Sequence, residues 1–484
     1  MDFTLRDIAT VTGGTWASAP SVAALTKRAT GVTIDSRAIR PGDLFVALEG
    51  TRVDGRDFVD AAQSAGAAAV LAEPRDGWPS AHPERVLLAP DARAALAALA
   101  TAHRARLTST AVIAVTGSVG KTTTCRLIDG ALSSALTGRA SPRSFNNNLG
   151  APLTVLSARP TDEYLVCEIG ASASGEIDRL AAIVRPDIAV ITGAGRAHLE
   201  GFGTIETVAC EKAALARAVT PGGVAIVASG SPHLECALAS ATCEIIRVGS
   251  SDGDDGRIED IEPIGCSSRD GGPLRPWLRV TLADGGVFEA PVAGRALAVN
   301  IALAVTVARR LGLDAGAIGR GLSRATPAPM RFEPIDVGGV LLINDAYNAN
   351  PESVAAALEA FGAVAPAGRC RVVVLGDMLE LGSAGPAAHR EAVHAALAVP
   401  GLARLTLIGP LFARAGAEAD DPCIEMIPDA SDEALAGVAA SLTVGAAVLL
   451  KGSRGMRLER IAEALAGAPA DLTLTAPAGR PEGR

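Results

Sequence analysis

Residues 111–128 have the sequence AVIAVTGSVGKTTTCRLI. An apolar run, a glycine-rich turn and an apolar-periodic segment follow one another, which predicts a strand, a phosphate-binding loop and a helix. Gly117 and Gly120 would let backbone N–H groups turn toward a phosphate. Lys121 would reach the terminal phosphates, and the Thr122 hydroxyl would hold Mg²⁺. The first glycine of the eight-residue Walker pattern is missing, so a glycine-rich turn before an ordinary helix is the alternative; the flanking strand and helix favour a nucleotide site.

The composition predicts a globular protein that does not bind nucleic acid. Its 484 residues are enough for two to four domains. Hydrophobic residues make up 49% and aromatic residues only 3%, which argues against binding through aromatic platforms. The net charge of -9 argues against a basic face that would neutralise nucleic-acid phosphates.

We expect a cytoplasmic protein, free of membrane insertion, whose cysteines are reduced. The opening sequence MDFTLRDIATVTGG lacks the basic and apolar regions of a signal peptide, and no apolar run is long enough to span a bilayer. The eight cysteines stand singly without a CxxC pair, so free thiols explain them better than disulfides or zinc ligands.

The first region, to about residue 105, alternates short apolar runs with helical stretches, which predicts a small α/β domain. Its polar signal is Asp35-Ser36-Arg37. From the residues alone, this segment is best interpreted as a connection between two strands. Residues 106–110 then form a linker to the region of the phosphate loop.

Two polar residues follow predicted strands after the phosphate loop. Glu168 ends the strand predicted at 164–168, where a carboxylate would either hold Mg²⁺ or cap the next turn. His198 follows the strand predicted at 186–191 and a glycine-rich turn. A lone histidine is usually structural, but its position in a domain with a phosphate loop favours the site. The asparagine-rich loop at 144–150 is, by itself, a turn.

Two helical patterns complete this region, at residues 206–218 and 294–311. Glu211 and Lys212 on the first are most simply a solvated face of the helix. Asn300 on the second lies among apolar residues.

The third region, from about residue 326, predicts a doubly wound sheet. Three apolar runs each end in a polar stretch, and helical segments lie between them. Because parallel strands present their carboxyl ends at one edge, a site is expected along that edge. The polar stretches are NDAYNANP at 344–351, GDMLELG at 376–382 and KGSRG at 451–455.

With these residues in place, the chain resembles the Mur ligase family of ATP-dependent amide-forming enzymes over nearly its whole length. NDAYNANP, GDMLELG, FNNNLGAPLT at 145–154 and AHLEGFG at 197–203 resemble the branch that adds D-alanyl-D-alanine. The DSR and GDLFVALEG segments near the N-terminus are shared with the branch that adds a diamino acid. The resemblance implies a three-domain α/β architecture. It comprises a UDP-substrate-binding domain at 1–105, a central P-loop ATP-binding domain at 106–325 and a C-terminal Rossmann-like domain at 326–484.

The resemblance implies a reaction in two steps, because a carboxylate at neutral pH is a poor electrophile and must first be activated. ATP phosphorylates the terminal carboxylate of a UDP-MurNAc-tripeptide, and the amine of D-Ala-D-Ala then displaces phosphate from the acyl phosphate. It implies ATP and Mg²⁺ as cofactors, small molecules as the only partners, and we expect a monomer. Matching positions place the phosphates at Gly117, Ser118, Gly120, Lys121, Thr122 and Thr123. They place one Mg²⁺ at Thr122 and a second Mg²⁺ at Glu168 and His198.

Further residues are assigned by matching positions of the family. Lys212 falls where the family carries a carbamoylated lysine, which would contradict its interpretation as a solvated residue. Asn300 matches a position at the adenine, Arg331 and Asp345 match positions at phosphate and ribose, and Asn348 would lie near the transferred phosphate. Ser36 and Arg37 would hold the UDP end, Asn147 the sugar-peptide, and Lys451 and Arg454 the carboxylate of the dipeptide.

Two departures from the family pattern keep a second hypothesis open. The usual GRHN is GRAL at 294–297, and the usual GANH after Glu168 is GASA at 170–173. Both lie near the nucleotide and the metal, so a paralogue that joins another acid and amine by the same chemistry is the main alternative. A catalytically silent scaffold is a third hypothesis, which the retained phosphate and metal ligands disfavour.

Overall fold

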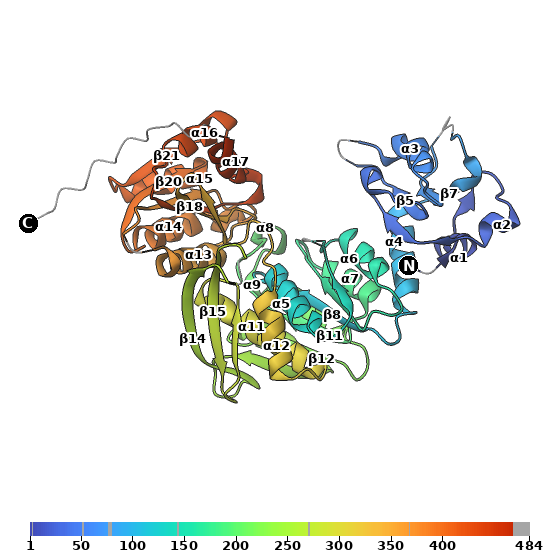
Figure 1. The fold of residues 1–484 in the computed structure, drawn as a ribbon, viewed down its shortest axis with the longest axis horizontal. Helices are drawn as coiled ribbons and strands as arrows, with labels where there is room; N and C mark the ends of the chain where they lie inside the picture. The colour runs from blue at the N-terminus through green and yellow to red at the C-terminus, as the bar shows by residue number, and fades with distance from the viewer. Residues whose placement is uncertain are drawn as a thin grey trace, which may run out of the picture.

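The structure is a computed structural model that describes residues 1, 3–50, 53–75, 80–142, 145–269, 272–366 and 368–467. Ser144 of the asparagine-rich loop and the end of the third region, 468–484, lie outside these residues. The chain forms three α/β bodies, each built on its own sheet, with the middle body between the other two (Figure 1). The predicted α/β class is confirmed; the domain boundaries at 105 and 325 stay predictions.

The N-terminal body has a five-stranded sheet in the order β2-β7-β6-β5-β4 and a two-stranded β1-β3 pair. Ser36 and Arg37 lie in the connection between β4 and β5, as the residues alone predict. Thr4 begins the first helix with a capping box, since its hydroxyl accepts from the Asp7 N–H and the Asp7 carboxylate accepts from the Thr4 N–H. The elements are β1 (Phe3–Thr4), α1 (Leu5–Thr12), β2 (Thr15–Trp16), α2 (Val22–Leu25), β3 (Arg28–Ala29), β4 (Gly31–Thr33), β5 (Asp43–Ala47), α3 (Val59–Ser64), β6 (Ala69–Ala72), β7 (Val86–Leu88) and α4 (Ala92–Arg104).

Helix α4 joins the N-terminal body to the central one. It packs against α6 and α7 of the central body, and one apolar core runs through both. At its end, buried Arg104 donates to the Val184 carbonyl and pairs with Asp187 at 3.0 Å. The first two bodies therefore share a packed contact on α4.

The central body has a nine-stranded sheet in the order β16-β15-β14-β13-β12-β11-β8-β10-β9. The strands from β9 to β14 are parallel, and β15 and β16 continue the sheet antiparallel. Strands β8, β10 and β11 are buried and almost wholly apolar because helices cover both faces. The strands are β8 (Ala111–Thr116), β9 (Gly138–Ala140), β10 (Tyr164–Glu168), β11 (Ile188–Ile191), β12 (Val224–Ala228), β13 (Glu244–Gly249), β14 (Gly256–Ser267), β15 (Arg275–Leu282) and β16 (Val287–Ala290).

The helices of the central body begin with the one that follows the phosphate loop. They are α5 (Lys121–Ser133), α6 (Gly150–Ser157), α7 (Glu176–Val184), α8 (Leu199–Phe202), α9 (Ile205–Arg217), α10 (Pro232–Leu238), α11 (Ala298–Arg310) and α12 (Ala315–Arg324). In the described part of the chain, no helix has the length and apolar character needed to cross a membrane.

The C-terminal body has a six-stranded sheet in the order β17-β18-β22-β19-β20-β21, parallel except for β17. This confirms the predicted doubly wound sheet. The three strands that end in the polar stretches, β18, β22 and β19, are adjacent. The elements are β17 (Glu333–Val337), β18 (Val340–Asp345), α13 (Pro351–Val364), β19 (Arg371–Gly376), α14 (Gly385–Leu397), β20 (Leu402–Ile408), α15 (Pro410–Ala419), β21 (Ile424–Ile427), α16 (Asp432–Ala440), β22 (Ala447–Lys451) and α17 (Glu459–Gly467).

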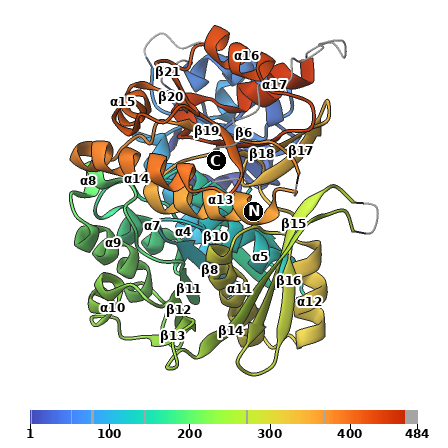
Figure 2. The same ribbon diagram turned by 90° about the vertical axis from the view of Figure 1, so that its left-hand side faces the viewer.

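Helix α13 lies between the C-terminal sheet and the central body (Figure 2). Its start is well specified, because Asn350 caps it reciprocally with Ser353 and Pro351 occupies the first turn. The carboxyl edge of the C-terminal sheet faces the loops that follow β8, β10 and β11, since Asp345 and Lys451 line one cavity with residues of those loops.

Candidate active site

The phosphate loop has the predicted form of strand, loop and helix. Strand β8 ends at Thr116 and α5 begins at Lys121. Gly117 and Gly120 have φ values of 146° and 85°. A Cβ at Gly117 would lie 2.0 Å from the Thr192 hydroxyl oxygen, so neither the backbone conformation nor the space admits a larger residue there.

A second loop, residues 192–198 after β11, braces the phosphate loop; we call it the β11 loop. The Ser118 N–H donates to the Gly193 carbonyl at 3.1 Å. The Ser118 hydroxyl donates to the Gly195 carbonyl at 3.1 Å and accepts from the Gly195 N–H at 2.9 Å. The shape of the phosphate loop therefore depends on the position of the β11 loop.

The Lys121 side chain is fixed within the phosphate loop and lines a large cavity. Its Nζ donates to the Gly117 carbonyl at 2.6 Å. Burial lowers its pKa, and the negative charge of Glu168 partly offsets that effect. A phosphate at this position would restore the charged form by pairing with it.

Glu168 faces the phosphate loop from the end of β10. Its side chain is 1% exposed, and its two oxygens accept from the Thr122 hydroxyl and the Asn146 amide, each at 2.8 Å. These contacts favour the site over the alternative of a cap on the next turn. A hydroxyl and a carboxylate side by side are hard oxygen donors, which fit Mg²⁺ when phosphates and water complete its shell. Among the residues that the structure describes, no group of three or more histidine, cysteine, aspartate or glutamate side chains is arranged to hold a metal.

The interpretation of Glu211 and Lys212 as a solvated face is wrong, because α9 is buried along most of its length. The Glu211 carboxylate accepts from the backbone N–H groups of Gly175 and Ile177, each at 2.7 Å. Lys212 is 2% exposed, and its Nζ lies 5.3 Å from the centre of the Phe202 ring. Burial, and then the charge of Lys121, lower the pKa of Lys212 to about 7.

His198 joins the central body to the C-terminal one. It has a left-handed backbone with φ of 55°, and its Nδ1 lies 2.5 Å from Glu380 Oε2. Glu380 is also left-handed, with φ of 63°. Burial lowers the pKa of His198, while the nearby Glu380 carboxylate raises it.

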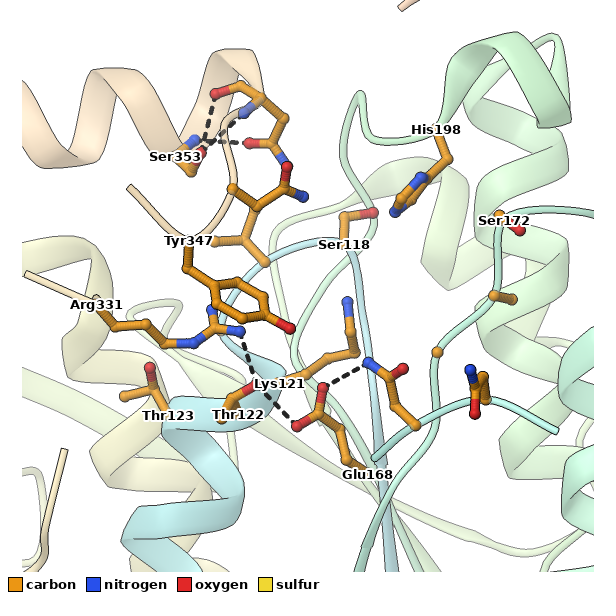
Figure 3. A pocket seen from close by; sticks show the side chains of 18 of the residues that line it. Ser118, Lys121, Thr122, Thr123, Glu168, Ser172, His198, Arg331, Tyr347 and Ser353 are labelled. Atoms are coloured by element: carbon orange, nitrogen blue, oxygen red, sulfur yellow. Dashed lines mark hydrogen bonds between the residues drawn. The ribbon is translucent and has the colours of Figure 1, made fainter. Parts of the chain in front are cut away.

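Arg331 brings a guanidinium from the linker before β17 to the phosphate loop. It donates to the Thr122 hydroxyl at 2.9 Å and stacks 4.3 Å from the centre of the Tyr347 ring (Figure 3). Its neighbours Met330 and Phe332 have left-handed φ values of 59° and 52°. Such backbone costs about 1–2 kcal/mol per residue, so the surrounding fold holds Arg331 in this place.

Two further predicted residues form an ion pair at the carboxyl edge of the C-terminal sheet. Lys451 Nζ lies 2.9 Å from Asp345 Oδ2 and donates to the Asn348 carbonyl at 2.6 Å. Lys451 is one of four lysines in the chain, and Lys121 and Lys212 are two others. Three of the four lysines are thus predicted site residues, whereas arginine supplies most of the other positive charge of the chain.

One cavity of about 740 Å³ brings together residues from all three bodies, within the usual range of small-molecule sites. Figure 3 shows Thr122 and Glu168 below Arg331 and Tyr347, with Lys121 beside them and His198 at the upper right of the view. The predicted residues that line it are Ser118, Gly120, Lys121, Thr122, Thr123, Asn147, Glu168, His198, Arg331, Asp345, Asn348 and Lys451.

Other predicted site residues do not line the large cavity. Asn300 is buried and turned to the phosphate loop, where its amide donates to the Gly120 carbonyl and the Thr124 hydroxyl. Gly117 and Lys212 are not among the residues that line the large cavity. Ser36 and Arg37 do not line the cavity, and the Arg37 side chain is 88% exposed.

Arg454 lies at a second, smaller cavity of about 90 Å³ that shares His198 and Asn348 with the first. Its Nη1 pairs with Glu459 at 2.9 Å. Leu379 and Glu380, from the stretch after β19, line the same small cavity.

Several lining residues were missed by the sequence reasoning. Arg93 at the start of α4 and Arg179 on α7 look like ordinary surface arginines in the sequence, yet they reach the large cavity. Tyr347 lies within the NDAYNANP stretch, which gave a signal for the segment but not for the ring. The apolar lining includes Ala293, Leu297, Ala356, Ala357 and Ala360.

Comparison with known families gives three matches in chain order. Residues 28–104 match "Mur ligase family, catalytic domain", residues 115–308 match "Mur ligase middle domain", and residues 330–454 match "Mur ligase, glutamate ligase domain". The three matches cover most of the chain.

Individual relatives are similar over nearly the full length. The UDP-N-acetylmuramoyl-tripeptide–D-alanyl-D-alanine ligase of Bacillus subtilis is 33% identical, covering 91% of this chain and 93% of that protein. The crystal structure of MurF from Acinetobacter baumannii is 29% identical with a TM-score of 0.80, covering 97% of this chain and 99% of that one. MurF ligase from Thermotoga maritima, solved in complex with ADP, is 28% identical with a TM-score of 0.72, covering 90% and 97%.

Proposed function

Because this chain belongs to the Mur ligase family of ATP-dependent amide ligases, we propose that it adds D-alanyl-D-alanine to UDP-N-acetylmuramoyl-tripeptide in peptidoglycan precursor synthesis. The observation that carries the proposal is the meeting of Arg331 with Thr122 across two bodies of the protein. It supports an ATP site completed by the C-terminal body, with a second, small cavity beside it. The name carried by the Bacillus subtilis relative supports the choice of substrates.

The reaction proceeds in two steps whose charges match the site. A carboxylate oxygen of the tripeptide attacks the γ-phosphorus of ATP, the bond to the β-phosphate oxygen breaks, and ADP leaves. The amine of the dipeptide then attacks the acyl carbon, and phosphate departs as the amide forms and the amine loses a proton. Lys121 and Arg331 bind the phosphates and neutralise two anions that must approach each other.

Mg²⁺ fits the oxygen donors at the phosphate loop. Thr122 and Glu168 would hold it, with His198 near a second ion. When bound, the ion supplies positive charge at the transferring phosphate and at the carboxylate. The protein's own part is to keep both donors buried and in contact, which it does at 2.8 Å.

Lys212 is proposed to carry a carbamate in the active enzyme. Only a neutral amine adds CO₂, and the pKa of Lys212, lowered to about 7, gives a substantial neutral fraction at neutral pH. The modification would replace a cation beside Lys121 with an anion. Mass measurement of the intact protein with and without bicarbonate tests this, and an unmodified lysine in a fully active preparation would contradict it.

The substrates are proposed to approach from two sides. Arg454 would meet the carboxylate of the dipeptide at the small cavity. Lys451 would meet it from the wall of the large cavity, beside Asn348, which lines both cavities. Asn147 lines the wall along which the sugar-peptide would lie. Ser36 and Arg37 would reach the UDP end only after the N-terminal body closes on the cavity.

The residues assigned to the nucleotide, the cellular location and the oligomeric state are also proposals. Asp345 would reach the ribose, while Gly117, Ser118, Gly120 and Thr123 shape the phosphate loop. Asn300 would contact the adenine after a change of partner, since its amide now supports that loop. ATP and UDP-linked substrates support a cytoplasmic enzyme, and we propose that it acts as a monomer.

The test is ligation with purified protein, ATP, Mg²⁺, UDP-MurNAc-tripeptide and D-Ala-D-Ala, with product mass and phosphate release followed together. The proposal predicts one amide product and one phosphate per turnover. Absence of product with this pair, together with turnover of another acid and amine, would replace the proposal by the paralogue. Undetectable ATP binding and no turnover across a broad panel would favour the scaffold.

The paralogue is kept as the second candidate because of one observation. Leu297, at the first departure from the family pattern, lines the large cavity beside alanines of α13, and Ser172, at the second, lines it near Glu176. Different side chains at these two places alter the wall that substrates touch.

A further inference from the structure

The β11 loop receives three carboxylates from the C-terminal body. Glu352 comes from the first turn of α13, Glu391 from α14, and Glu380 from the stretch after β19. All three end on two side chains of the loop, Arg196 and His198. This short loop is therefore a contact site between the central body and the C-terminal body.

Arg196 makes the most extensive of these contacts. Its Nε lies 3.0 Å from Glu352 Oε1, which also accepts from the Arg196 backbone N–H at 3.2 Å. Its Nη1 lies 3.0 Å from Glu391 Oε2. A guanidinium suits this task because its planar donors point in fixed directions toward two partners.

The residue before Arg196 carries the contact to the phosphate loop. Gly195 exchanges two hydrogen bonds with the Ser118 hydroxyl, and a Cβ there would lie 3.2 Å from the Glu352 carboxyl carbon. Glycine thus lets the carboxylate approach the backbone closely. The path from α13 to the phosphate loop runs through Glu352, Arg196, Gly195 and Ser118 without a gap.

We infer that Arg196 is a positioning residue that couples the seating of the C-terminal body to the ATP site. The inference rests on the proposed function in taking ATP as the ligand of that site. Arg196 lines neither of the two cavities; it holds α13 so that Arg331 and Asp345 stay over the phosphate loop. No role for this residue follows from the family pattern quoted above.

The exposure of the three side chains decides what kind of effect to expect. Arg196 is 41% exposed, Glu352 37% and Glu391 57%. Ion pairs so close to solvent contribute little to folding, so the effect belongs to binding, where two arrangements of the bodies compete. Couplings between sites change affinity by about 5- to 150-fold, and we expect the low end, about fivefold to tenfold.

The experiment measures ATP binding by calorimetry and the spacing of the two bodies by fluorescence transfer, in the full-length protein. Arg196→Ala is expected to weaken ATP binding about fivefold to tenfold and to broaden the spacing, while Arg196→Lys restores part of each. Glu391→Gln is the second variant, which removes one pair and leaves the loop intact. Arg390→Ala, which breaks an exposed pair with Glu418 within the C-terminal body, is the matched control and should leave both readouts unchanged.

The decisive comparison places Arg196→Ala in an Arg331→Ala background. If Arg196 acts by seating the body that carries Arg331, its effect on ATP affinity falls to about twofold or less there, because coupled residues are not additive. The same effect in both backgrounds, or unchanged spacing in Arg196→Ala, would overturn the inference. Both readouts are independent of ligation, so failure to join the proposed acid and amine would leave this result interpretable.

Discussion

Lys212→Met is expected to stabilise the protein while it abolishes ligation. The Lys212 side chain is buried in α9, and burial with the neighbouring Lys121 lowers its pKa from 10.5 to about 7. In the unfolded chain the amine regains its ordinary pKa. Folding at pH 7.5 therefore requires the amine to give up most of its proton.

The size of the effect follows from the two pKa values. One pKa unit corresponds to about 1.4 kcal/mol, so the three units between pH 7.5 and 10.5 amount to about 4 kcal/mol against folding. Methionine has a similar length and no charge, so it avoids this penalty. The folded chain binds fewer protons than the unfolded chain between about pH 7 and 10.5, and wild-type stability accordingly rises with pH across that window. The advantage of the variant should shrink to roughly 1 kcal/mol at pH 9.5.

Scanning calorimetry in CO₂-free buffer measures the difference. For a body of this size, 1 kcal/mol shifts the melting temperature by about 2–4 °C, so the variant should melt roughly 10 °C higher at pH 7.5 and a few degrees higher at pH 9.5. Lys27→Met changes an exposed lysine and should stay within about 0.5 kcal/mol of wild type at both pH values. A variant less stable than wild type, or a gap that does not fall with pH, would refute the reasoning.

Three further substitutions test the phosphate and metal sites. Lys121→Ala should lower phosphate release by roughly a hundredfold or more with an unchanged circular dichroism spectrum, and near-normal turnover would remove the loop from the mechanism. Glu168→Gln keeps the shape but not the charge, so the Mg²⁺ concentration for half-maximal activity should rise by about tenfold or more; an unchanged Mg²⁺ titration would exclude Glu168 as a ligand. Arg331→Lys keeps the charge but loses the stacking on Tyr347, so KM for ATP should rise by roughly tenfold, whereas an unaltered KM would show that the fixed guanidinium is unnecessary.

The local parts of the site could be predicted from the sequence because each of them is formed by consecutive residues. The apolar run, glycines and helix of residues 111–128 lie together in the chain, so strand β8, the phosphate loop and α5 were predictable. The three polar stretches of the third region follow apolar strands, and a parallel sheet must bring such ends to one edge. Local chemistry alone placed Lys212 wrongly on a solvated face, since the residue is buried. The resemblance to the Mur ligase family assigns Lys212 to the site, and that role stays a prediction.

The features of the site that could not be predicted from the sequence depend on contacts between segments that are distant in the chain. Helix α9 is rich in alanine, which leaves little contrast between its faces, so the burial of Lys212 could not be seen in its pattern. Arg196 and Glu352 are separated by 156 residues, and nothing near either one indicates the other. Asn300 looked like a polar residue on an apolar helix, and only the fold shows that its amide supports the phosphate loop.

The central claim is that phosphate is transferred to the carboxylate before the amide forms. The most direct test uses the UDP-linked tripeptide with ¹⁸O in its terminal carboxylate and measures the isotope in the released phosphate. If an acyl phosphate forms, one carboxylate oxygen leaves with phosphorus, so each phosphate released during ligation carries one ¹⁸O atom and the other product is ADP. Unlabelled phosphate, or AMP in place of ADP, would contradict the account.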